Sequence, residues 1–199
     1  MSGSNSAENF FLWSSQYVED GFMFEKEVEY IGKRLFQEHL IGGNFGNISV
    51  RYENGFYITR TGSFVDHPGD LIFVPLEGTV PKEASSEYRV HREVYRKTSY
   101  QAIVHAHPPH AVACSLKLDK IVPLDSEGEM LCPVIPVSIG KPGTDELAES
   151  VSQDLTSSKL TITRGHGTFA GGKNLEEAYL LTSLAEHSCR ILGLASQYQ

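Results

Sequence analysis

Several features that would point to a specialised class of protein are missing from this sequence. No run of apolar residues approaches the roughly 18 that a membrane-spanning helix needs. The N-terminal residues show no basic region followed by an apolar one, so no secretory signal is expected. Positive charge is scarce: 17 Lys and Arg stand against 25 Asp and Glu, which leaves a formal net charge of −8. Nucleic-acid backbones need clustered cations, so this balance argues against a nucleic-acid partner.

Cysteine is also scarce. Cys114, Cys132 and Cys189 are an odd number, lie far apart and form no CxxC pair. They are typical of reduced thiols in the cytoplasm and not of a disulfide framework. What is present is an ordinary apolar fraction of 40% over 199 residues, enough for the core of one domain. We therefore expect a cytoplasmic, single-domain protein without a membrane partner.

Helices and strands are predicted to alternate along the chain. Apolar residues spaced three and four apart predict a helix over 22–39 that ends before Gly42-Gly43. Asn54-Gly55 predicts a tight hairpin, and residues 121–140 are strand-like and broken by prolines. Further helices are expected after Ser85-Ser86, Pro108-Pro109, Thr144 and Asn174, the last extending to about Leu192, and further strands at 71–74, 102–106 and 159–163. The class is therefore α/β or α+β, with one sheet covered by helices on both faces.

The histidines carry the sharpest chemical signal. His105 and His107 are two apart at the end of an apolar strand, so their side chains are expected on the same face, as a pair of metal ligands. The alternative is two polar residues at a strand end. A third histidine, His166, lies between two glycines that permit close backbone approach, and Glu87 follows two serines. Three histidines and a carboxylate are typical ligands of a catalytic zinc ion, with Mn²⁺ or Co²⁺ as alternatives.

Small polar residues in three separate segments predict an anion-binding site. Backbone N–H groups, amides and hydroxyls can bind phosphate without a lysine. The nucleotide-binding patterns GxxxxGK[ST] and GxGxxG are absent, so a nucleotide is not expected. Each segment taken alone is better explained as an ordinary turn or helix cap, and the prediction rests on the combination of the segments with the histidines. The residues concerned are Asn44, Gly46, Asn47, Thr61, Gly62, Ser85 and Ser86.

Six motifs then occur in a family-specific order: GGNFGNISVR, ITRTGS, SSEYRVH, IVHAHPPHAVA, GTDEL and RGHGTFAGGKNLEEA. From about residue 25 to residue 192 the chain resembles the class II aldolase/adducin family. The resemblance implies a three-layer α/β/α domain with a central, mostly antiparallel sheet. It also implies a homotetramer whose active sites lie at subunit interfaces. Residues 21–199 are expected to form this catalytic domain, and residues 1–20 an N-terminal arm.

The resemblance also implies roles for individual residues. His105, His107 and His166 match the family's zinc ligands. Glu87 matches its acid/base glutamate, which can also contact the metal when no substrate is bound. Asn44 stands where fuculose-phosphate aldolases have a threonine. The family's phosphate contacts correspond to Asn47, Thr61, Gly62, Ser85 and Ser86.

The implied activity is that of a zinc-dependent lyase of carbohydrate metabolism. It would cleave a small phosphorylated sugar, a ketose 1-phosphate similar to fuculose 1-phosphate, into dihydroxyacetone phosphate and an aldehyde. Dehydratases, decarboxylases and 4-epimerases acting on phosphorylated sugars share this scaffold and remain alternatives. A non-catalytic adducin-like module is a further alternative, although such a module has no need of three histidines and Glu87.

Two departures from the family pattern concern tyrosines. Fuculose-phosphate aldolases carry a tyrosine in a long C-terminal extension, whereas this chain has only Tyr198 in a short tail. A second family tyrosine, after the HxH helix, is replaced here near Glu127. Glu127 is therefore either a substitute acid/base residue or an exposed turn carboxylate.

Overall fold

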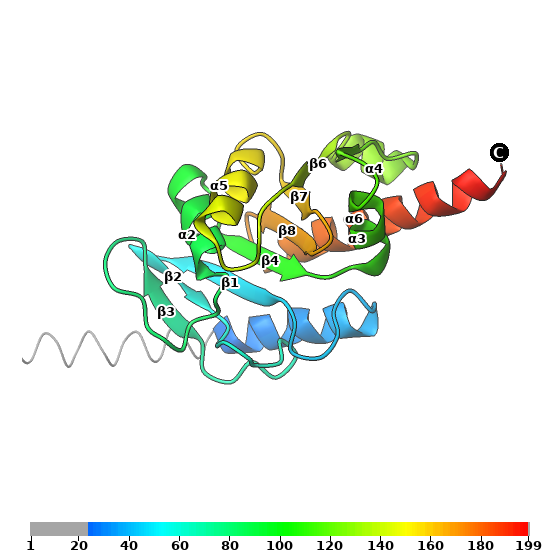
Figure 1. Ribbon diagram of the computed structural model, residues 1–199. Coiled ribbons are helices and arrows are strands. Elements are labelled where there is room, and N and C mark those ends of the chain that lie inside the picture. Colours follow the sequence, from blue (N-terminus) through cyan, green and yellow to red (C-terminus); the bar gives the residue numbers. More distant parts are fainter. Residues whose placement is uncertain (1–23, 199) are drawn as a thin grey trace, which may run out of the picture.

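A single sheet forms the centre of the protein in the computed structural model, which describes residues 24–198 (Figure 1). The expected arm, residues 1–20, lies outside the described residues. Within them the sheet has eight strands in the order β3-β2-β1-β4-β8-β7-β6-β5. All neighbours pair antiparallel except β6 and β7, which confirms the mostly antiparallel sheet. The strands are β1 (Asn47–Tyr52), β2 (Gly55–Ile58), β3 (Ile72–Pro75), β4 (Ala102–Ala106), β5 (Lys120–Ile121), β6 (Ile135–Ser138), β7 (Leu160–Thr163) and β8 (Gly167–Gly172).

Helices cover both faces of this sheet, as the sequence predicted. A helix over residues 24–37, together with α3 and α6, packs on one face, and α2 and α5 pack on the other (Figure 1). Successive side chains of β4 point to opposite faces, so each face has apolar residues for a helix layer to cover. Val104 belongs to the core on the first face, and its neighbour Ile103 to the core on the second. No helix among the described residues is long and apolar enough to cross a bilayer. The remaining helices are α2 (Tyr88–Lys97), α3 (Pro109–Ser115), α4 (Ser126–Leu131), α5 (Asp145–Asp154) and α6 (Leu175–Ala195), followed by the short 3₁₀ turn η1 (Ser196–Tyr198).

Two local predictions about turns and caps were wrong. The β1–β2 hairpin turns at Glu53-Asn54 and not at Asn54-Gly55, because Gly55 already pairs with Tyr52. Gly55 is needed inside the strand, since a Cβ there would lie 2.4 Å from the Phe73 ring. The serines before α2 do not cap it either. Glu87 occupies the N-cap position, and no side chain satisfies the first turn.

The segment 121–140 also differs from its prediction. It contains only short strands, β5 and β6, and between them the helix α4. Asp125 caps this helix by accepting a hydrogen bond of 2.8 Å from the backbone N–H of Gly128. Six residues are too few for a recognisable helical period, so the pattern resembled a broken strand.

Strand direction brings distant segments to one end of the sheet. The end of β2, the start of β1, the end of β4 and the start of β8 are neighbours, because these strands pair antiparallel. Asn47 pairs with His105, and Ala106 with Thr168. These strand ends and the loops that leave them carry His105, His107, His166 and the segments of Asn47 and Thr61, and the β-bridge between Arg60 and Ala84 brings Ser85 and Ser86 beside them.

Candidate metal centre

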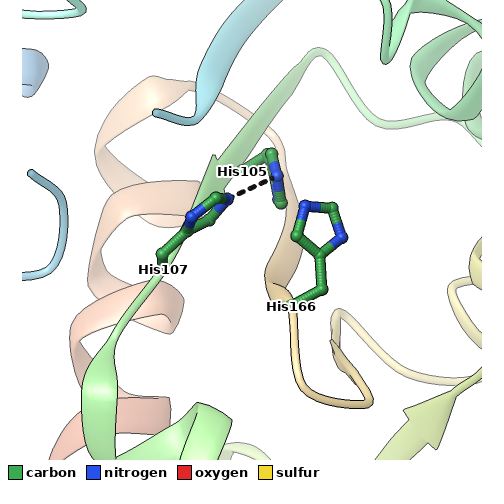
Figure 2. A group of neighbouring side chains, drawn as sticks. All are labelled: His105, His107 and His166. Carbon is green, nitrogen blue, oxygen red and sulfur yellow. Dashed lines mark hydrogen bonds between the residues drawn. The ribbon is translucent and has the colours of Figure 1, made fainter. Parts of the chain in front are cut away.

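His105 and His107 meet through their Nε2 atoms. His105 is buried in β4, and its Nδ1 donates to the backbone oxygen of Thr168 at 2.9 Å. This bond fixes the tautomer and leaves the Nε2 lone pair free. His107 follows the strand, and its Nε2 lies 3.0 Å from that of His105. The expectation that the HxH pair projects side by side is confirmed by this geometry (Figure 2).

His166 completes a group of three convergent imidazoles. It lies in the turn between β7 and β8, and its ring faces those of His105 and His107 (Figure 2). One ligand atom from each of the three lies within 4.8 Å of the others. Both flanking glycines are needed. Gly165 has a positive φ of 66°, and a Cβ at Gly167 would lie 2.3 Å from the backbone oxygen of Ala106.

The surroundings keep these imidazoles neutral. Burial lowers the pKa of His105 well below its usual value, and the neighbouring histidines lower it further. Burial, with His166 nearby, lowers the pKa of His107 to about 4. Burial also lowers the pKa of His166. Only an unprotonated imidazole binds a metal, so all three are in the form that a divalent cation requires.

The residues present fit a metal ion. The buried Nδ1 of His166 has no hydrogen-bond partner within the described chain, which is costly for an imidazole unless a ligand completes the site. Three nitrogen donors with an open remaining position are typical of catalytic zinc. Imidazole nitrogens can also bind Mn²⁺ or Co²⁺, so the donor set alone does not select zinc. The three histidines could therefore hold a divalent cation at this end of the sheet.

Glu87 lies at the wall of the same cavity and outside the histidine cluster. It is 5% exposed, and its Oε1 accepts a 2.9 Å hydrogen bond from the backbone N–H of Gly143. Its other oxygen, Oε2, is buried and unpartnered within residues 24–198. Burial raises the pKa of the Glu87 carboxyl, against the lowering effects of the Gly143 N–H and Arg89. A buried carboxyl with a raised pKa and one unpartnered oxygen is suited to act as a general acid or base.

The predicted anion-binding residues line this cavity of about 160 Å³, so the structure brings three separate segments together. Asn47 is buried beside His105, and its Oδ1 has no partner within the described residues. Gly62 has a φ of 75°, and no atom lies within 4 Å of where its Cβ would be. The cavity is therefore open in front of this backbone. Those lining it are Asn44, Gly46, Asn47, Thr61, Gly62, Ser85 and Ser86.

Three further residues belong to the site and were not identified from the sequence. Phe45 is exposed at the cavity, and its ring stacks on His107 with centroids 5.7 Å apart. Arg60 also lines the cavity. Gly143, in the GTDEL motif, holds Glu87 through its N–H. All three stand inside quoted motifs, but the spacing of Phe45 and Arg60 did not indicate that they line the cavity. The contact of Gly143 is made by its backbone, so residue type gave no signal for it.

The structure does not bring Glu127 or Tyr198 to this cavity. Glu127 is exposed on α4, where it accepts a hydrogen bond from Ser126. Tyr198 is 91% exposed beyond the end of α6. Glu127 lies instead near Asp125 and His187, a second group of ligand-type side chains. The role of either residue as a substitute for a family tyrosine stays a prediction.

Fold and cavity together define a class: an α/β/α protein with three convergent histidines that could hold a divalent cation, in a cavity lined by small polar residues. Residues 26–192 match the family described as Class II Aldolase and Adducin N-terminal domain. The chain is 33% identical over 162 residues to an L-fuculose phosphate aldolase of Methanococcus maripaludis (strain C5), covering 79% of this chain and 88% of that protein. It is also 33% identical to the L-fuculose phosphate aldolase of Escherichia coli (strain K12), covering 72% of this chain and 70% of that one.

A solved structure agrees with these relatives. The L-fuculose-1-phosphate aldolase from Thermus thermophilus superposes with a TM-score of 0.84 and 42% sequence identity, over 86% of this chain and 93% of that one. The chain therefore belongs to the class II aldolase and adducin family. The family and fold predicted from the motifs are confirmed, and family and relatives together support an enzyme of the lyase class.

Proposed function

We propose that this protein is a metal-dependent aldolase that cleaves a small ketose 1-phosphate, similar to fuculose 1-phosphate, into dihydroxyacetone phosphate and an aldehyde. One observation carries the proposal: three neutral histidines, a buried carboxylate and the anion-binding segments line a single cavity. The relatives named as L-fuculose phosphate aldolases support the choice of substrate class.

In this proposal the phosphate is bound by neutral donors. Thr61, Gly62, Ser85 and Ser86 line the same cavity as the histidines, and their hydroxyls, together with the backbone N–H of Gly62, are proposed to bind the phosphate. They fix the sugar phosphate in one orientation, so that its carbonyl end reaches His105 and its neighbours. Such positioning lowers the entropic barrier and adds no chemistry of its own.

Glu87 is proposed to move the proton. Retro-aldol cleavage removes a proton from a substrate hydroxyl and returns one to carbon, so one group must both accept and donate it. Oε1 of Glu87 is held by Gly143, and Oε2 is free to face the substrate. Burial raises the pKa of this carboxyl, which favours its protonated form relative to an exposed glutamate.

His105, His107 and His166 are proposed to hold the metal, with Glu87 as a further ligand when no substrate is bound. Zinc is the first choice, and Mn²⁺ or Co²⁺ are the alternatives. A bound divalent cation would supply Lewis-acid stabilisation of the negative charge that develops on the substrate oxygens. Neutral imidazoles leave the full charge of the ion for this purpose.

The proposal extends to a homotetramer with active sites at subunit interfaces. A segment between residues 116 and 139 exposes an unusual number of large apolar side chains: Leu116, Leu118, Val122, Leu124, Met130, Leu131, Val134 and Ile139. An apolar surface of this kind is typical of a protein interface. Leu116 also lies near the turn that carries His166, since a Cβ at Gly165 would be 3.1 Å from its Cδ2. A second copy bound on this surface would therefore border the metal centre.

The test is the release of dihydroxyacetone phosphate from L-fuculose 1-phosphate, measured in a coupled assay with and without a chelator. Release that the chelator abolishes and zinc restores is expected. No release from zinc-loaded protein would contradict the aldolase. Dehydratase, decarboxylase and epimerase activity would then be assayed on phosphorylated sugars, since neither Glu127 nor Tyr198 reaches the cavity within one chain.

A further inference from the structure

Arg60 is a positively charged residue in the lining of a cavity whose predicted anion-binding groups are otherwise neutral. It follows β2, and among the described residues that line the cavity it is the single Lys or Arg. The other lining residues supply amides, hydroxyls, imidazoles, glycine backbone, the ring of Phe45 and the carboxyl of Glu87. A phosphate dianion bound in this cavity would face the carboxyl of Glu87. The positive charge of Arg60 would offset the repulsion between the two negative groups.

The backbone at Arg60 is held firmly beside the serine segment. Arg60 forms a β-bridge with Ala84, and the N–H of Thr61 donates to the backbone oxygen of Glu83 at 2.8 Å. The carbonyl of Arg60 accepts from both the backbone N–H and the Oγ of Ser63, at 3.1 and 2.8 Å. The base of the Arg60 side chain is therefore fixed next to Ser85 and Ser86.

The guanidinium group of Arg60 has no structural partner within the described residues, in contrast to several other arginines. Arg34, Arg96 and Arg164 each pair with a carboxylate. The guanidinium of Arg60 forms neither an ion pair nor a hydrogen bond with any residue in the 24–198 range, and the side chain is exposed. Five N–H donors in a planar fork match the oxygens of a phosphate group, so this unpaired group is available to a ligand.

We infer that Arg60 is a specificity-determining residue whose guanidinium neutralises the phosphate of the bound sugar and selects phosphorylated over neutral substrates. This rests on the proposed function for the identity of the substrate, but the binding of phosphate can be measured without turnover. The neutral donors then set the orientation of the phosphate, and Arg60 sets the preference for its charge.

The probe is inorganic phosphate, titrated by calorimetry into the zinc-loaded full chain and its variants. Arg60→Gln removes the charge and keeps a hydrogen-bonding side chain of comparable reach, so phosphate affinity should fall about tenfold. Arg60→Lys keeps the charge and should stay within about threefold of the wild type. Arg190→Gln is the matched control, because this exposed arginine of α6 does not line the cavity and changes the net charge equally.

A second probe, dihydroxyacetone, carries no phosphate. Its affinity should be the same for wild type and Arg60→Gln. Equal phosphate affinity of wild type and Arg60→Gln would overturn the inference, as would a wild type that binds no phosphate or a variant that loses both probes alike. Phosphate binding that depends on Arg60 in a protein that cleaves no ketose 1-phosphate would contradict the proposed aldolase and leave this inference standing.

Discussion

At the scale of single residues, the proposed metal binding depends on three imidazoles whose free nitrogens face a common point. His105 is oriented by the backbone oxygen of Thr168, and His107 is flanked by the ring of Phe45. Neither contact requires a metal. The site is therefore preorganised by the fold, so that metal binding does not have to order these side chains.

His107→Ala tests the ligand role. Removing one of three nitrogen donors should weaken zinc binding by about 100-fold or more, and activity should fall with metal content. Metal content by atomic emission and a competition titration with a chromophoric chelator would measure this. His67→Ala is the control, since His67 is exposed and does not line the cavity. Wild-type zinc affinity in His107→Ala would exclude this residue as a ligand.

Glu87→Gln separates proton transfer from metal binding. The amide keeps the shape of the side chain and can still accept the hydrogen bond from Gly143, and zinc content should remain because the three histidines are unchanged. Turnover of a ketose 1-phosphate should fall roughly 10²- to 10⁴-fold, because the amide cannot exchange a proton. If the variant turned over at the wild-type rate, the acid/base assignment would be wrong.

At the scale of elements, the β7–β8 turn packs closely against the end of β4, and Gly167 makes this close packing possible. A methyl group at Gly167 would lie 2.3 Å from the backbone oxygen of Ala106 and 2.7 Å from Cδ2 of His107. Gly167→Ala should therefore cost roughly 1–3 kcal/mol of unfolding free energy and weaken zinc binding as well. Gly193→Ala, in α6 with no atom within 4 Å, should instead stabilise by up to about 1 kcal/mol. Chemical denaturation measures both, and a neutral Gly167→Ala would contradict the packing argument.

Elements with strong local signals were predictable from the sequence. Thr144 accepts from the N–H of Leu147, and Asn174 from that of Glu177, so the starts of α5 and α6 follow from their caps. The strand β4 followed from its apolar run. The helix α4 and the β1–β2 turn did not, because one is too short for a period and the other is decided by the contact of Gly55 with Phe73.

The candidate site was predictable in its residue types and not in its contacts. The HxH spacing indicated the pair that meets at Nε2, and the glycines around His166 indicated close approach. The contact of Glu87 with Gly143 joins residues 56 positions apart through a backbone group. Arg60 is brought beside the serine segment by the β-bridge to Ala84. No sequence pattern encodes either contact.

At the scale of the whole molecule, buried neutral histidines link stability to pH. The pKa of His91, lowered by complete burial to about 3, adds to the lowered values of His105, His107 and His166. An unfolded histidine binds a proton near pH 6.5, whereas these folded ones bind it only at lower pH. Protons therefore favour the unfolded chain as pH falls from about 6.5 toward 4. The raised carboxyl pKa values of Glu25, Glu87 and Asp154 act in the opposite direction, and lowered carboxyl pKa values elsewhere act in the same direction as the histidines.

Metal-free protein should accordingly have a smaller free energy of unfolding at pH 5 than at pH 7.5. Urea denaturation of chelator-treated protein at the two pH values measures the difference. Equal stability at both, or greater stability at pH 5, would mean that these histidines are not held neutral by burial.

The apolar segment 116–139 makes a prediction about assembly. Met130 is 74% exposed, so Met130→Glu should not disturb the fold of one chain. A charge within an apolar interface is costly, and the variant should have a lower mass than the wild type in analytical ultracentrifugation. Leu194→Glu, exposed on α6 outside this segment, should keep the wild-type mass. A wild type that sediments as a monomer would contradict the proposed assembly.

The central claim is that one metal ion is bound where the three histidines converge. An anomalous difference map from zinc-loaded crystals, recorded at the zinc absorption edge, tests it most directly. We expect a peak within coordination distance of nitrogen atoms from His105, His107 and His166. Absence of that peak, or a peak only at the second group formed by Asp125, Glu127 and His187, would contradict it.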